Sequence, residues 1–237
     1  MIDYEKEFQT PGYAAATRET AIARTFKLAY GWMAAGLALS GIVAWQTAAS
    51  GFCAKVLQGP GLAMCVIAEL ALVFALSGAI RKIPAGVAIA LFAAYAALNG
   101  LTLSVVFVAY PVAAVEKVFF VTAAMFGGLA LWGSFAKSDL SSIGSFCGML
   151  LWGIVIAGIA NLFFASQGLD LILSFAGVLV FSGLAMYDAQ KIKALAQAEG
   201  TMDAQTATKA GILGALALYL DFVNLFLSLL RIFGREK

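Results

Sequence analysis

Seven long apolar runs divide the chain, and each approaches or exceeds the roughly twenty residues that a helix needs to cross a bilayer. Pro60, Pro84 and Pro111 lie at or beside the boundaries of these runs, where proline's fixed φ and missing N–H are best tolerated. The pattern predicts an all-α, polytopic membrane protein, a bundle of seven transmembrane helices. The helices are expected at residues 28–48, 61–80, 84–109, 115–136, 143–165, 169–188 and 211–231.

The composition supports this class and argues against others. Hydrophobic residues make up 62% of the 237 residues and charged residues only 12%, which is more apolar than a soluble domain. The net charge is +2 and the basic residues are scattered, so we expect no nucleic-acid partner. Cys53, Cys65 and Cys147 lack the spacing of a zinc site or a disulfide framework, and the chain has no histidine. We expect no tightly bound cofactor.

The basic residues also predict an orientation in the lipid bilayer. Residues 1–24 are polar and show no cleavable signal pattern, so we expect a cytoplasmic N-terminal tail, followed by the seven-helix domain at 25–237. The loops then predicted to be cytoplasmic hold most of the lysines and arginines, in accord with the positive-inside rule. Arg231, Arg235 and Lys237 do not fit this rule, so the last helix either re-enters or crosses; we expect a full crossing.

Two aspartates lie where hydrocarbon is expected. Asp188 closes the sixth apolar run and Asp221 lies inside the seventh. A charge at the bilayer centre costs roughly 2.5–3.5 kcal/mol, so such acids are functional candidates. The two helices are antiparallel neighbours, and the acids can meet if the sixth helix continues through Gln190 and Ile192. Two carboxylates in a poorly solvated site cannot both ionise cheaply, so we expect them to share one proton and to sense pH.

Further polar residues predict a path for a cation. Glu69 lies in the middle of the second predicted helix, and Asn99 and Thr102 share a face of the third. Asn224 lies on the same stripe of the seventh helix as Asp221. The alternative for the amides and the hydroxyl is hydrogen bonding between helices, and for Glu69 a structural role.

Small residues recur along the predicted helices and would allow close helix packing. We expect such contacts at Gly127 with Gly128, Gly144 with Gly148, and Gly153 with Gly158.

Two segments resemble the signatures of the Bax inhibitor-1 family, closest to its bacterial inner-membrane branch. They are the run Met-Tyr-Asp-Ala-Gln-Lys-Ile at 186–192 and the run Leu-Tyr-Leu-Asp-Phe-Val-Asn-Leu-Phe at 218–226, followed by Leu-Leu-Arg-Ile-Phe-Gly at 229–234. The resemblance covers the whole seven-helix layout. The chain differs in its sixth-to-seventh connection, at residues 194–210, which we interpret as a longer loop.

The resemblance implies a pH-sensitive calcium leak channel of the inner membrane. It assigns Asp188 and Asp221 as the pH-sensing pair and Arg81 as a latch on that pair, with Lys82 as the alternative. It also matches Glu69 to the family's acid in the second helix. Some bacterial members instead restrain a membrane-anchored ATP-dependent protease, so a regulator without flux of its own is the alternative function.

Calcium as the transported ion agrees with the oxygen ligands that the chain offers, because Ca²⁺ prefers carboxylates, amides and carbonyls. Asp188 and Asp221 are the expected metal ligands, at a weak and transient site, since an ion that is held tightly does not leave. Intramembrane aspartyl proteases also carry aspartates on their sixth and seventh helices. Their Gly-x-Gly and Pro-Ala-Leu elements are missing here, so we expect no enzyme.

Overall fold

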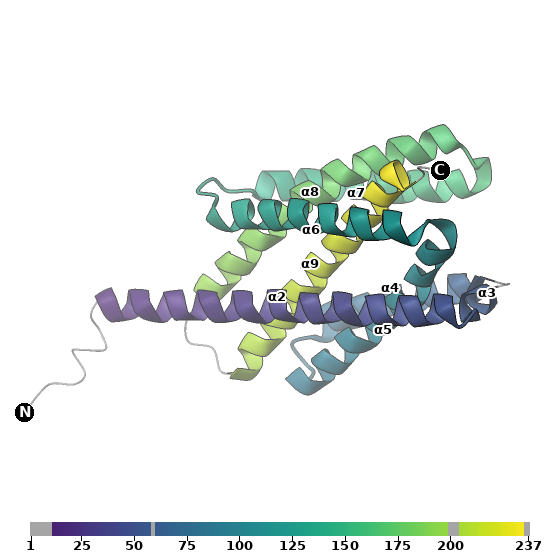
Figure 1. The fold of residues 1–237 in the computed structure, drawn as a ribbon. Helices are drawn as coiled ribbons and strands as arrows, with labels where there is room; N and C mark the ends of the chain where they lie inside the picture. The colour runs from purple at the N-terminus through teal and green to yellow at the C-terminus, as the bar shows by residue number, and fades with distance from the viewer. Residues whose placement is uncertain (1–10, 58–59, 199–203, 235–237) are drawn as a thin grey trace, which may run out of the picture.

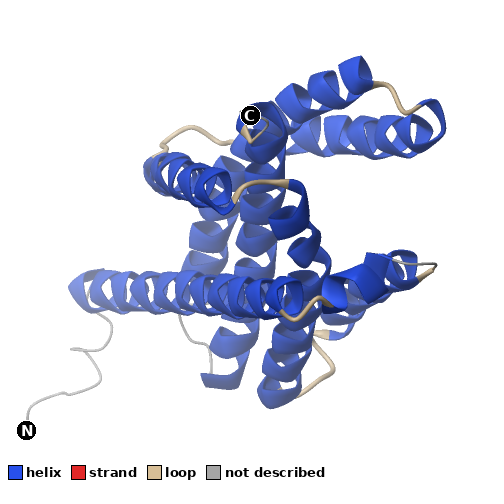
Figure 2. Ribbon diagram, turned by 45° about the vertical axis from the view of Figure 1, so that its right-hand side comes forward, coloured by secondary structure: helices blue, strands red, loops and turns tan. Residues whose placement is uncertain are grey.

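The computed structural model describes residues 11–57, 60–198 and 204–234, and within these ranges every regular element is an α-helix, as Figure 1 and Figure 2 show. Among the described helices, seven are long and apolar enough to cross a membrane, which confirms the predicted fold class. The helices are α2 (Pro11–Ala49), α3 (Phe52–Leu57), α4 (Gly61–Ala79), α5 (Ala85–Ala109), α6 (Val112–Phe135), α7 (Ser141–Phe164), α8 (Gln167–Ala198) and α9 (Ala204–Phe233).

Three of the spanning helices are longer than their apolar runs. Helix α2 begins at Pro11, although its apolar span begins only at Ala23. Helix α8 continues through Gln190 and Ile192 to Ala198, as contact between the two aspartates requires. The interpretation of residues 194–210 as a long loop is wrong, because α8 and α9 occupy both of its ends and only residues 199–203 fall outside the described chain. Alanine, lysine and glutamine favour a helix there, and lysine and glutamine do so without extending the apolar run.

Helix α9 forms the axis of the bundle. In Figure 1 it crosses obliquely between α2, α4 and α5 on one side and α6, α7 and α8 on the other. Its most apolar window is 72% buried inside the protein, whereas no other span exceeds 39%. Most residues of α9 therefore have protein neighbours, and buried polar groups on this helix must find partners within the bundle.

The outer helices turn large apolar side chains away from the bundle, as contact with lipid requires. Examples with well over half of their surface exposed are Phe74, Phe120, Trp132, Trp152 and Phe163.

The expected close packing at paired glycines is mostly wrong. Of the six glycines, only Gly144 lies against a neighbour, the ring of Tyr187; the other five have no atom within 4 Å of the Cβ that a larger residue would add. The closest approaches to the backbone of another helix are made elsewhere. Gly133 of α6 lies against the backbone carbonyl of Met186, and Gly100 of α5 lies against that of Ser40. Glycine spacing alone does not tell which face of a helix meets a neighbour.

The extension of α8 beyond Asp188 is tied to the connection between α6 and α7. Gln190 accepts a hydrogen bond from the Leu140 backbone N–H at 2.8 Å and donates one to the Ser138 carbonyl at 2.8 Å. Lys193 Nζ donates to the Ser134 carbonyl at 2.8 Å. These bonds fix the position of α8 next to the aspartate that it carries.

Candidate functional site

Asp188 on α8 and Asp221 on α9 meet inside the bundle, where their carboxyl groups form a side-chain hydrogen bond. Asp221 is only 4% exposed, and Asp188 is partly buried. Asp221 Oδ2 is buried and has no hydrogen-bond partner among the residues that the structure describes. A hydrogen bond between two carboxyl groups needs a proton on one of them, and that proton also relieves the repulsion between two buried charges.

The positive charge of Lys191 interacts with the Asp188 carboxyl group. Lys191 lies three residues further along α8 and hence on a neighbouring position of the helix surface. Its Nζ lies 5.7 Å from the centre of the Tyr187 ring. The sequence places Lys191 inside the motif that contains Asp188, and their spacing of three residues is the signal that points to this interaction.

Arg81, the predicted latch, lies away from the aspartate pair in this conformation. It is exposed, as is Lys82, in the connection between α4 and α5. Within the described residues neither side chain forms an ion pair with Asp188 or Asp221, and the Arg81 backbone carbonyl accepts a hydrogen bond from Lys209 Nζ at 3.5 Å. The latch stays a prediction.

A cleft of about 710 Å³ lies between α4, α5 and α9, and Glu69, Asn99 and Asn224 all line it. These are the three residues predicted for an ion pathway. Leu62, Tyr110 and Arg231 also line the cleft, so it extends toward the side where α4 begins and where α5 and α9 end. Neither Asp188 nor Asp221 lines it. The pair and the cleft are therefore separate sites, connected through α9.

Glu69 receives hydrogen bonds from two neighbouring side chains. Thr102 Oγ1 donates to Glu69 Oε1 at 2.7 Å, and Asn99 Nδ2 donates to Glu69 Oε2 at 3.3 Å. Asn224 uses its amide N–H differently, donating to the Leu220 carbonyl at 2.8 Å. The described chain holds no group of three or more histidine, cysteine, aspartate or glutamate side chains that would bind a resident metal. The donor set suits brief contact with a hydrated cation better than tight binding.

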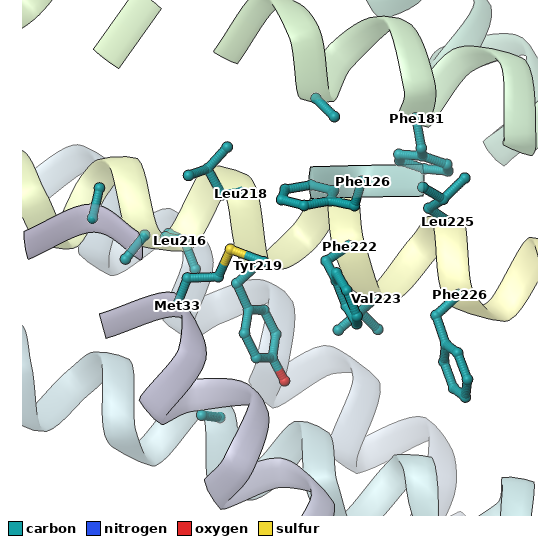
Figure 3. Close-up of a cluster of buried hydrophobic side chains, with 14 of the residues drawn as sticks. Met33, Phe126, Phe181, Leu216, Leu218, Tyr219, Phe222, Val223, Leu225 and Phe226 are labelled. Carbon is teal, nitrogen blue, oxygen red and sulfur yellow. The ribbon is translucent and has the colours of Figure 1, made fainter. Parts of the chain in front are cut away.

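Sequence reasoning missed Tyr219 and Ser40. Tyr219 is fully buried and donates a hydrogen bond from its hydroxyl to Asn99 Oδ1 at 2.9 Å; the same hydroxyl lies 2.6 Å from Ser40 Oγ. In Figure 3 the Tyr219 side chain leaves α9 toward α2, while Leu218 points to the opposite side. A signal was present, because a tyrosine hydroxyl inside a span must find a partner.

The sequence pattern also does not indicate a role in the site for Arg231 of α9. Its guanidinium lies 3.8 Å from Asp170 Oδ1 of α8, and both side chains are partly exposed. Because Arg231 lines the end of the cleft, the cleft carries a positive group there and the carboxyl group of Glu69 further inside.

Six spanning helices arranged around a seventh, buried one, with a pair of contacting aspartates, define a polytopic membrane protein. The family model described as inhibitor of apoptosis-promoting Bax1 matches residues 23–237. The chain therefore belongs to the Bax inhibitor-1 family, as the motifs predicted.

Bacterial relatives match nearly the whole chain. Inner membrane protein YbhL of Escherichia coli strain K12 is 46% identical over 210 residues, which cover 88% of this chain and 90% of the relative. An uncharacterized protein of Deinococcus radiodurans is 45% identical and covers 90% of this chain and 89% of its own length. An uncharacterized protein of Rickettsia prowazekii is 33% identical over the full length of both chains.

Proposed function

We propose that this protein is a calcium-conducting leak channel of the bacterial inner membrane whose gate senses pH through Asp188 and Asp221. The observation that carries the proposal is the contact between these two carboxyl groups inside a bundle of membrane helices. The inner-membrane location draws on the similarity to the Escherichia coli protein of that description.

The cleft supports the conducting part of the proposal. Glu69 and Thr102 place oxygen atoms in a hollow that begins at one side of the bundle and reaches the middle of α4, and the Asn99 amide lies beside them. Oxygen ligands of this kind suit a hard cation such as Ca²⁺. Calcium itself enters the proposal through the family resemblance, because the residues alone indicate only an oxygen-lined path.

The aspartate pair supports the gating part. With a shared proton, Asp188 and Asp221 hold α8 and α9 together; without it, two negative charges would repel each other in a poorly solvated site. Helix packing at this point would therefore differ between the two protonation states, and a shift of α9 would alter the cleft that it lines. Arg81 remains the proposed latch for a conformation in which it approaches the pair.

Glu69→Gln is expected to lower calcium flux into proteoliposomes by about tenfold, which corresponds to about 1.4 kcal/mol. The amide keeps the size of the side chain but removes the charge that attracts the cation. The midpoint of the pH response should not move, because the aspartate pair is unchanged. Flux would be measured for several cations across a pH series.

Glu116→Gln is the matched control, because Glu116 is an exposed acid on α6 that does not line this cleft. Unchanged flux in Glu69→Gln would show that Glu69 has a structural role and takes no part in the cation path.

A second candidate function is a regulator that binds a membrane-anchored ATP-dependent protease. The observation that favours it is the N-terminal extension of α2, because residues 11–22 continue the helix beyond the span that begins at Ala23 (Figure 1). At 1.5 Å per residue this extension is roughly 18 Å long, enough to reach a neighbouring protein. We propose that it lies on the cytoplasmic side, where the positive-inside rule places it.

Deletion of residues 1–22 separates the two candidate functions. An intrinsic pore should keep its cation flux in proteoliposomes, because the deletion leaves every span and both acid sites intact. A regulator should lose its effect on turnover of protease substrates in cells that lack the native protein. Loss of flux from the folded, truncated protein would contradict the pore.

A further inference from the structure

We propose that Tyr219 and Ser40 are positioning residues, which hold the Asn99 amide against Glu69. Through α9 they also connect the part of the cleft around Glu69 to the aspartate pair. The proposal rests on the proposed cation path and adds to it a physical link between the two acid sites.

The link is a chain of side-chain hydrogen bonds across four helices. Ser40 of α2 lies 2.6 Å from the Tyr219 hydroxyl of α9, which donates to Asn99 Oδ1 of α5 at 2.9 Å. Asn99 Nδ2 then donates to Glu69 Oε2 of α4 at 3.3 Å. From Tyr219 onward, each group donates to the next and the chain ends at a carboxyl group. This direction stabilises a negative charge on Glu69.

Tyr219 decides which end of the Asn99 amide faces Glu69. An asparagine side chain carries an acceptor oxygen and a donor NH₂ group, and the hydrogen-bond network selects between the two orientations. The donated bond from Tyr219 requires the oxygen on its own side, so the NH₂ group faces Glu69. Without that bond the amide is free to turn and to place its oxygen next to the Glu69 carboxyl, where two oxygen ligands would face one cation.

The surroundings of Tyr219 keep its hydroxyl in place. Its ring is packed edge-on by Phe92 and Tyr95, with centroids 6.0 and 5.6 Å away. Ser40 Oγ also lies 2.7 Å from the Ala96 carbonyl, an alternative acceptor for its single hydroxyl proton, and Ser40 is itself nearly inaccessible. A polar atom that loses its partner at this depth finds no water to replace it, so the network favours discrete arrangements over gradual deformation.

Helix α9 joins this network to the aspartate pair. Tyr219 and Asp221 are two residues apart, which places them about 200° apart around the helix. Tyr219 therefore faces α2 and α5 while Asp221 faces α8, as the bonding partners of each residue show. A rotation or shift of α9 that follows a change in the pair must move the Tyr219 hydroxyl relative to Asn99.

The first test compares Tyr219→Phe with Tyr30→Phe in calcium flux measurements. Both substitutions remove only a tyrosine hydroxyl, but Tyr30 of α2 lies outside the cleft and outside this chain of hydrogen bonds. For Tyr219→Phe we expect the half-saturating calcium concentration to fall by about tenfold, together with the maximal flux, because the freed Asn99 oxygen retains the ion longer. Ser40→Ala should shift both values in the same direction by less.

Tyr30→Phe should leave both flux parameters close to those of the wild type. Equal behaviour of the Tyr219 and Tyr30 variants would overturn the positioning role. So would a fall in maximal flux with an unchanged half-saturating concentration, which is the result of losing folded protein.

The second test does not depend on flux. The tyrosine doublet in the Raman spectrum reports the hydrogen bonding of the hydroxyl, and subtraction of the Tyr219→Phe spectrum isolates Tyr219. We expect this signal to change in Asp221→Asn and not in Glu116→Gln. An unchanged signal in Asp221→Asn would overturn the link through α9. If the wild-type protein conducts no cation, the leak proposal fails, and this spectrum alone decides the link.

Discussion

Replacing Asp221 by asparagine is expected to abolish the pH dependence of the cation leak. An amide can keep a hydrogen bond to Asp188, but it cannot lose the proton that the acid pair shares. A single-proton switch changes the ratio of its two states by up to about tenfold per pH unit, so a flat response should be readily distinguished from that of the wild type. Asp188→Asn should act in the same way. The measurement is calcium flux into proteoliposomes across a pH series.

Asp139→Asn is the control for this experiment. Asp139 is exposed in the connection between α6 and α7, and hydrogen bonds from the Ser141 hydroxyl and backbone N–H lower the pKa of its carboxyl. It is therefore ionised throughout the neutral range, and its stabilising bonds are lost only as pH falls through that lowered pKa. Its replacement should leave the pH response intact. A normal pH response in both Asp188→Asn and Asp221→Asn would remove the pair from the gate.

The second large effect is expected from Gly133→Val, which should destabilise the bundle by about 3 kcal/mol or more. The added Cβ would overlap the Met186 backbone carbonyl of α8, and a carbonyl within a helix cannot turn aside as a flexible side chain can. Because Met186 lies two residues before Asp188, α8 would have to move together with the aspartate pair. The expected results are a lower thermal midpoint in detergent and less monodisperse protein.

Gly128→Val is the matched control, because Gly128 lies on the same helix with no atom near its would-be Cβ. Equal stability of the two variants would show that α6 and α8 do not approach each other as closely as described.

The spans and their count could be predicted because lipid imposes a simple requirement, an apolar run of sufficient length. The same rule fails at helix ends. Helix α8 continues well beyond its apolar run, since Lys191 and Gln190 are good helix formers that lie where polar groups are tolerated. Hydropathy locates the part of a helix in hydrocarbon, whereas propensity and tertiary bonds, such as those of Gln190, decide where the helix ends.

The contact between Asp188 and Asp221 could be anticipated because an acid inside a span needs a partner, and adjacent antiparallel helices offer one. The network around Tyr219 could not, because it joins residues of α2, α5 and α9 that are far apart in the sequence. Their meeting depends on how α9 is rotated within the bundle, which a single stripe of polar residues does not define when most of the helix surface is buried.

The central place of α9 has a consequence for how the protein is made. Six spans precede it in the sequence, so they enter the membrane while the axial position is still vacant. During that interval Asp188 and Asn99 have no partner from α9, and the two halves of the bundle share chiefly the contact between α2 and α8. Assembly must therefore finish in one late step, in which the newly inserted α9 completes the core and supplies hydrogen-bond partners to polar groups on the earlier helices.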